Sequence, residues 1–322
     1  MTSTIDKGHL ITVAMVAYNS SAYIREAIES VLCSSYERFE LLIADDNSTD
    51  DTWQIIQSYT DPRIRAIRNE KNLGEYPNRD QCVRLAAGEY LIFIDGDDII
   101  YPHGLEFSVR MLDAFPECGM ALMRWFRNNL IYPAIISPGQ FYIGEYFGQG
   151  FLGTAFSNVV FRTEILRNAG SLTMGYKCGD DYIRYKIALH HPALLISDSL
   201  TWWRETPGQA FQTHHRSGRL FLDSYRLRFE FLDHPDCPLS REEIAEAREN
   251  LYKALSTEIL KALFKFKVEK VRGIVSELKF QPRHWLKCFN RFISKDPLEG
   301  STPVNPYRCP IGRNPYSKCP QS

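Results

Sequence analysis

The chain has 322 residues, 44 % of them hydrophobic and 24 % charged, and its formal net charge is −1 at pH 7. This length and composition predict one large α/β domain, a smaller annex and a substantial core. The charge argues against a nucleic-acid-binding protein, because neutralising phosphates requires a clear excess of Lys and Arg.

The N-terminal segment and the cysteines indicate a cytoplasmic protein. The only apolar run before Tyr18 is too short for a signal peptide or a membrane span. Eight cysteines are scattered without a CxxC pair or a metal-ligand spacing, which favours reduced, buried thiols.

Strands and helices alternate in the first part of the chain. In chain order we expect a strand at 10–16, a helix at 24–32, a strand at 40–45, a helix after 51, a strand at 64–67, a helix at 78–87 and a strand at 90–95. Asn19, Ser20 and Ser21 are candidate N-caps of the first helix, and Ser48 and Asp51 have capping-box spacing before the second. The alternation predicts a mostly parallel sheet with helices on both faces.

Polar side chains stand where three of these strands end. They are Tyr18 and Asn19, then Asp45 and Asp46, then Asp95, Asp97 and Asp98 around Gly96. Ligands bind outside the carboxyl ends of parallel strands, so we expect these groups to converge at one edge of the sheet. Three adjacent carboxylates repel one another and call for a cation, although Asp and Gly are also the usual residues of a solvated turn.

The next part of the chain is less regular. Residues 139–157 are rich in Gly and aromatic residues, which suits a pocket wall or a mobile loop. A short strand at 159–161 and a helix from Thr163 follow. Asp180 and Asp181 then stand at a helix start, where capping alone would explain one of the two carboxylates.

A helical segment runs from 217 to 294, with Ser240 and Glu243 as a capping box, and a Pro-rich tail that we expect to be flexible begins at Lys295. Residues 253–295 hold eleven Lys or Arg and three Glu, a net charge of +8, interleaved with apolar residues. This segment would lie on an anionic membrane surface, or it would be a solvated helical face whose apolar side packs on the catalytic domain.

These segments together resemble inverting glycosyltransferases of family 2, which have the GT-A fold. The segments that carry the resemblance are VAMVAYNSSAYIREAIESVL, IADDNSTDDT, EKNLG, AAGEYLIFIDGDDIIYP, NVVFRTEILRNAG and GDDYIRYKIA, spread over residues 9–210. The expected architecture is a Rossmann-like GT-A domain at 1–215, a helical annex at 216–294 and a tail at 295–322.

The resemblance implies a nucleoside-diphosphate sugar donor, expected to be UDP-linked, with Mn²⁺ or Mg²⁺ as cofactor and a saccharide or lipid-linked saccharide as acceptor. Asp97 would be the direct metal ligand, and Asp95 and Asp98 would contact ribose or complete the metal shell. Gly96 would let the backbone approach the nucleotide. The remaining donor contacts implied are Ala17, Tyr18 and Asn19 beside the nucleoside, Asp46 on the base, and Arg79 on the diphosphate or base, unless Arg79 is simply solvated.

Inversion requires a base that takes the proton from the attacking hydroxyl, and the resemblance assigns this role to Asp181. Asp180 replaces the usual Glu beside it, with a shorter arm, and is expected to contact the nucleotide sugar. Arg204 matches a further family motif and is expected to contact the nucleotide sugar as well, but Thr206 stands where the family often has a metal-contacting His. His214 or His215 would replace that His from a loop, or both are ordinary surface histidines. Trp202 and Trp203 would stack on a sugar or pack in the core.

Other classes fit less well. An oxidoreductase would carry GxGxxG after its first strand, where this chain has AYNSSA, and a nucleotidyltransferase would carry a Gly-rich loop there. A non-catalytic nucleotide-sugar-binding or assembly subunit is the remaining alternative. Because Asp95, Asp97 and Asp181 are all present, we favour an enzyme of cell-surface polysaccharide synthesis, cytoplasmic or peripheral on the inner face of the membrane.

Overall fold

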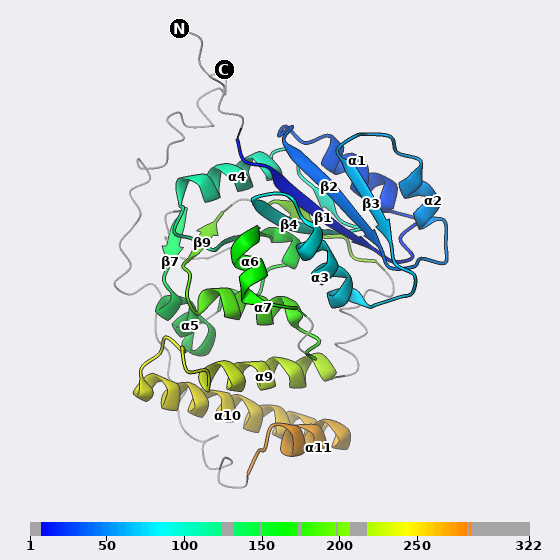
Figure 1. Cartoon of the computed structure of the whole chain (residues 1–322). Helices are drawn as coiled ribbons and strands as arrows, with labels where there is room; N and C mark the ends of the chain where they lie inside the picture. The colour runs from blue at the N-terminus through cyan, green and yellow to red at the C-terminus, as the bar shows by residue number, and fades with distance from the viewer. Residues whose placement is uncertain are drawn as a thin grey trace, which may run out of the picture.

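An eight-stranded sheet forms the centre of the protein in the computed structural model (Figure 1). The structure describes residues 8–123, 132–148, 150–172, 175–197, 199–206, 218–281 and 284. The strands, in their order across the sheet, are β3 (Ile64–Arg68), β2 (Phe39–Asp45), β1 (Ile11–Ala17), β4 (Tyr90–Asp95), β8 (Val159–Arg162), β6 (Met120–Met123), β9 (Ala193–Ile196) and β7 (Ala134–Ile136). The strands β8 and β7 run antiparallel to their neighbours, and the other pairings are parallel. The predicted α/β fold with a mostly parallel sheet is confirmed.

Helices cover both faces of this sheet. One face packs against α1 (Ile24–Leu32), α2 (Thr52–Gln57) and α4 (Gly104–Ala114). The other packs against α3 (Glu75–Leu85), α5 (Pro138–Phe147), α6 (Thr163–Ala169) and α7 (Gly179–Ala188). The strand β1 is buried along its whole length, as its unbroken apolar run requires when helices lie on both sides.

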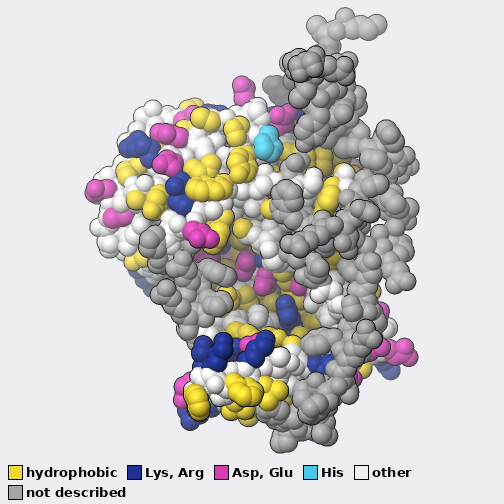
Figure 2. Space-filling view, turned by 180° about the vertical axis from the view of Figure 1, so that it is seen from behind, with side chains coloured by type: hydrophobic (Ala, Val, Ile, Leu, Met, Phe, Trp, Pro, Cys, Tyr) yellow, Lys and Arg dark blue, Asp and Glu magenta, His cyan; other side chains and the backbone are white. Residues whose placement is uncertain are grey.

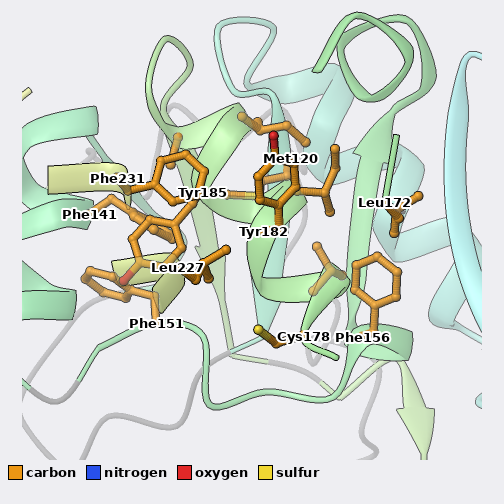
Figure 3. Packing of buried hydrophobic residues seen from close by; sticks show 14 of the residues in the cluster. Met120, Phe141, Phe151, Phe156, Leu172, Cys178, Tyr182, Tyr185, Leu227 and Phe231 are labelled. Atoms are coloured by element: carbon orange, nitrogen blue, oxygen red, sulfur yellow. The ribbon is translucent and has the colours of Figure 1, made fainter. Parts of the chain in front are cut away.

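Three further helices form a layer beyond α5 and α7 (Figure 1). They are α9 (Arg219–Leu232), α10 (Arg241–Phe264) and α11 (Val268–Glu277), and the predicted capping box of Ser240 and Glu243 is present at the start of α10. Their apolar residues belong to the same buried cluster as those of α5 and α7, and Figure 3 shows Phe231 of α9 against Tyr185 of α7. The two rings stack with centroids 4.8 Å apart. The annex therefore holds α7 in place. No helix in the described ranges is long and apolar enough to span a membrane.

Two predicted helix caps are wrong. At α1 the N-cap is Tyr23, and no side chain caps the helix. At α2 the Ser48 hydroxyl donates to the nearby Asp45 carboxylate and so does not cap the helix. A carboxylate three residues away offers a stronger, charge-assisted acceptor for this hydroxyl.

The prediction of an irregular segment at 139–157 is wrong for its first half, which α5 occupies with a Ser137–Gln140 capping box. Most sides of α5 are buried, so its sequence lacks the alternation of apolar and polar residues that marks a surface helix. The strands β6, β7 and β9 have only three or four residues each, too few to show a pattern. Among the five described cysteines, all free thiols, Cys33 is exposed, contrary to expectation.

Candidate functional site

The acidic cluster follows β4 in a tight turn. The Asp98 N–H donates to the Asp95 carbonyl over 3.0 Å, and the Gly96 N–H donates to the Val16 carbonyl of β1 over 2.9 Å. A Cβ added at Gly96 would lie 3.2 Å from side-chain atoms of both Ala17 and Ser20. The turn is thus pressed against the loop after β1, and only glycine fits without displacing a neighbour.

A buried arginine supports Asp95. The guanidinium of Arg79, on α3, donates to Asp95 Oδ1 over 2.7 Å and to Glu75 Oε1 over 3.2 Å. Arg79 is 4 % exposed, and its Nε has no hydrogen-bond partner among the described residues. A guanidinium this deep in the protein needs its carboxylates, so Arg79 fixes one oxygen of Asp95.

The segment 201–206 returns to the same turn. A small antiparallel sheet pairs β10 (Thr201–Trp202) with β5 (Ile99–Ile100). As a result the Thr206 hydroxyl donates to Asp97 Oδ2 and Arg204 Nε donates to the Asp97 carbonyl, each over 2.8 Å. Thr206, which replaces the family histidine, therefore contacts the carboxylate expected to bind the metal.

Asp98 lies beneath this surface. It is 1 % exposed, and its carboxylate accepts the Arg204 N–H over 3.0 Å and the Ser157 hydroxyl over 3.4 Å. Burial, and next the charge of Asp95, raise the pKa of Asp98 to about 7. Asp98 ties the turn to Arg204 and Ser157, and its proposed contact with ribose or metal stays a prediction.

The second acidic pair begins α7. A single buried arginine, Arg184, donates through Nη2 to Asp180 Oδ2 over 3.0 Å and to Asp181 Oδ1 over 2.7 Å. The Tyr76 hydroxyl of α3 donates to the other oxygen of Asp180 over 3.2 Å. Asp180 is therefore held by side chains from α3 and α7. In the described part of the chain, Asp181 accepts a hydrogen bond from one side chain, that of Arg184.

The surroundings of Asp181 suit a proton acceptor near neutral pH. Burial raises its pKa to about 7, the Asp180 charge adds to the rise, and Arg184 opposes it. Two further charges also act on this pKa: Glu145 raises it and Arg228 lowers it. The annex helix α9 thus brings a positive charge close to Asp181.

The two acidic groups lie in one site. The short 3₁₀ helix η1 (Phe156–Asn158) places the Phe156 ring 5.6 Å from Cζ of Arg79 and 5.8 Å from Cζ of Arg184. One ring therefore neighbours both the arginine that holds Asp95 and the arginine that holds Asp181. Figure 2 shows acidic side chains in a hollow between the sheet domain and the helical annex.

The ends of β1 and β2 meet beside this hollow. Asn19 has a φ of 52°, and its Oδ1 accepts the Thr49 N–H over 2.8 Å. Asp46 is 3 % exposed and accepts the N–H groups of Leu73 and Gly74, each over 2.8 Å. Asp46 therefore shapes the loop before α3, and its contact with a base stays a prediction.

The other predicted residues are exposed, form ion pairs or lie outside the residues that the structure describes. Tyr18, Trp202 and Trp203 are exposed, so neither Trp is a core residue. Arg204 forms an ion pair with Glu26 over 2.6 Å. His214 and His215 lie outside the described residues.

Sequence reasoning missed several residues of the site, namely Glu75, Tyr76, Phe156, Ser157, Arg184 and Arg228. Arg184 carried one usable signal, since it follows Asp180 by four residues on a helix and so faces the same side. The others come from separate elements, and only the fold brings them together.

The acidic turn fits a divalent ion that shares its ligands with a diphosphate. Among the residues the structure describes, no group of three or more Asp, Glu, His or Cys could hold a metal by itself. Mg²⁺-type ions are commonly bound by one or two carboxylates together with substrate phosphates. Asp97, half-buried, and Asp95, with 39 % of its side chain exposed, offer the hard oxygen ligands that such an ion prefers.

The fold and the polar edge of its sheet define an α/β protein of the GT-A type. The family described as Glycosyl transferase family 2 matches residues 12–169. Residues 12–169 of the chain belong to this family.

Curated relatives match over part of their length. EpsE of Bacillus subtilis is 33 % identical over 145 residues, which are 42 % of this chain and 52 % of that protein. The Escherichia coli UDP-Glc:alpha-D-GlcNAc-diphosphoundecaprenol beta-1,3-glucosyltransferase WfaP is 39 % identical over 89 residues, 28 % of this chain and 36 % of that protein. The chain spans about half or less of the length of these relatives.

Solved structures share the fold over most of the chain. S. aureus TarS 1–349 in complex with UDP-GlcNAc superposes with a TM-score of 0.67 at 19 % identity, covering 85 % of this chain and 82 % of that one. The Pyrobaculum calidifontis mannosyltransferase PcManGT, in complex with GDP-Man and Mn²⁺, gives 0.57 at 16 % identity, covering 84 % and 86 %.

Proposed function

We propose that this protein is a metal-dependent inverting glycosyltransferase. It would move a hexosyl or N-acetylhexosaminyl group from a UDP-sugar to a saccharide or lipid-linked saccharide during synthesis of a cell-surface polysaccharide. The names of relatives support this choice: WfaP uses UDP-Glc and a diphosphoundecaprenol-linked acceptor, and TarS was crystallised with UDP-GlcNAc.

The donor would bind at the ends of β1, β2 and β4. Asp97 and Asp95 would hold Mn²⁺ or Mg²⁺, which when bound offsets the negative charge that grows on the departing nucleoside diphosphate. Gly96 lets the chain pass close to the nucleotide, while Arg79 and Thr206 each orient one carboxylate oxygen. The nucleoside would lie beside Ala17, Tyr18 and Asn19.

The acceptor would enter from the side of α7. Asp181 would take the proton from its hydroxyl as the oxygen attacks the anomeric carbon opposite the leaving group, so an α-linked donor gives a β-linked product. Arg184, 1 % exposed, keeps the Asp181 carboxylate oriented, and a pKa of about 7 makes this carboxylate a stronger base than an ordinary Asp.

One observation supports the proposal most strongly: the Phe156 ring lies 5.6 Å from Cζ of Arg79 and 5.8 Å from Cζ of Arg184, the arginines that hold the carboxylates on β4 and on α7. Donor binding and proton removal would then occur side by side. A non-catalytic nucleotide-sugar-binding or assembly subunit would need the carboxylates that follow β4 to bind the donor. It would have no use for the carboxylates at the start of α7.

Thermal unfolding with a panel of UDP-sugars and GDP-mannose, with and without Mn²⁺, tests the donor site. A ligand at a hundred times its Kd adds about 2.7 kcal/mol to the unfolding free energy. We expect protection by a UDP-sugar that depends on Mn²⁺ and is lost in Asp97→Ala. Equal protection of the wild type and Asp97→Ala would contradict the metal assignment.

The same panel separates an enzyme from a binding subunit. In an enzyme, Asp181→Asn should keep the protection by donor and lose transfer to a lipid-diphosphate-linked sugar. Protection without any transfer by the wild type would favour the binding subunit. We further propose that the protein acts in the cytoplasm, where it would meet such an acceptor at the inner membrane face.

A further inference from the structure

Exposed apolar side chains gather where α10 turns into α11. Five of the ten large hydrophobic side chains that are exposed in the described part of the chain lie here: Leu260, Leu263, Phe264, Phe266 and Val268. We call these five residues the apolar tip. Phe264 is 84 % and Phe266 is 89 % exposed. Single exposed apolar residues are ordinary, but a contiguous group marks a binding surface.

The backbone at Phe266 favours a different residue. The Lys267 N–H donates to the Ala262 carbonyl over 2.8 Å and the Phe266 N–H to the Leu263 carbonyl over 3.0 Å, the two bonds of a Schellman motif. Phe266 occupies its left-handed position with a φ of 52°, where glycine is the usual residue. The fold gains almost no packing from this ring, so a requirement outside the fold would account for it.

The charges around the two rings are positive. Lys265 and Lys267 alternate with Phe264 and Phe266, are exposed, and form no ion pair with any residue that the structure describes. From 260 to 281 the chain has six Lys or Arg and two Glu. Figure 2 shows hydrophobic side chains on the surface of the annex beside Lys and Arg side chains. This charge suits an anionic partner and opposes self-association through the tip.

We propose that the apolar tip inserts into the surface of a membrane that contains anionic lipids. Phe264 and Phe266 would enter the boundary between headgroups and acyl chains, while Lys265 and Lys267 would remain among the lipid phosphates. Figure 1 places the α10 to α11 turn in the layer farthest from the sheet, so the rest of the domain would stand clear of the bilayer. This binding is independent of the transfer reaction.

Vesicle flotation of the full chain tests the proposal. We expect binding to phosphatidylglycerol/phosphatidylcholine vesicles, weak binding to phosphatidylcholine alone, and loss of binding at high salt. The double variant Phe264→Ser with Phe266→Ser should bind at least about tenfold more weakly, because two buried rings are lost. As a matched control, Arg110→Gln, which removes an exposed cation from α4, should bind like the wild type.

The variant Phe266→Gly gives the sharper test. Glycine relieves the left-handed backbone, so the Tm should stay the same or rise while vesicle binding falls. Flotation of the wild type that is equal on neutral and anionic vesicles, or absent on both, would overturn the proposal. So would a dimer that forms through the tip, which size-exclusion chromatography would detect as a change to monomer in the double variant.

Discussion

Replacing Asp181 by Asn should slow transfer severely and, at the same time, stabilise the protein. The pKa of Asp181 rises from 3.8 to about 7 on folding, chiefly because of burial. The folded chain therefore holds this proton to higher pH than the unfolded chain does, and stability falls as the pH rises from about 4 to about 7. At 1.36 kcal/mol per pKa unit, the ionised carboxylate costs the folded state at most about 4 kcal/mol.

The expected gain is smaller than this limit. The Asp181 side chain is 26 % exposed, so water screens part of the effect, and we expect Asp181→Asn to gain about 1–3 kcal/mol above pH 7. Asn keeps an oxygen that can accept from Arg184, and Asp180 still balances the buried guanidinium. Near pH 4 most of the gain should be lost, because the folded state then keeps Asp181 protonated and the unfolded carboxyl group is close to its own pKa of 3.8.

Urea unfolding at pH 4, 6 and 8 measures the stability, and release of UDP in the presence of acceptor measures transfer. Asp236→Asn is the matched control, since it removes the same charge from an exposed side chain. Turnover should fall by about 10²–10⁴-fold in Asp181→Asn only. Turnover of Asp181→Asn within tenfold of the wild type would refute the assignment of Asp181 as the base. Equal stability of Asp181→Asn and the wild type at pH 8 would refute the claim that burial of the charged Asp181 destabilises the folded state.

Two further variants examine how the annex acts on the site. The positive charge of Arg228 lowers the pKa of Asp181, so Arg228→Gln should raise this pKa. The acid limb of the pH profile of kcat/KM should then move to higher pH. An unchanged pH profile would contradict this prediction. In Phe231→Ala a 1 % exposed ring that stacks on Tyr185 is lost, so unfolding should become easier by about 3–5 kcal/mol in urea and turnover should fall with the loosening of α7. A loss below 1 kcal/mol would show that the annex does not hold α7.

The first half of the fold could be predicted because its signals are local. Apolar runs such as that of β1 reveal strands buried on both faces, and their polar ends locate the edge of the sheet that carries Asp46 and Asp97. The capping prediction at Ser48 was wrong because its hydroxyl donates to the nearby Asp45 carboxylate. At the start of α1 the backbone carbonyl of Ser20, and not its side chain, accepts the Ile24 N–H.

The residues that hold the carboxylates of the site in place could not be predicted from such local signals. Burial of Arg79 and Arg184 depends on where α3, α7 and η1 meet, and no pattern in the sequence fixes that meeting point. The helix α5 was missed because a helix buried on most sides loses its amphipathic period. The role of Thr206 likewise depends on the pairing of β10 with β5, two-residue strands that leave no periodic signal.

The anomeric configuration of the product tests the central claim most directly. The measurement is an NMR spectrum of the sugar that the wild type transfers from an α-linked UDP-sugar to a lipid-diphosphate-linked acceptor in the presence of Mn²⁺. A single displacement assisted by Asp181 predicts a β linkage, formed at a rate that collapses in Asp181→Asn. A product that keeps the α configuration, or that forms equally fast without the Asp181 carboxylate, would contradict the account.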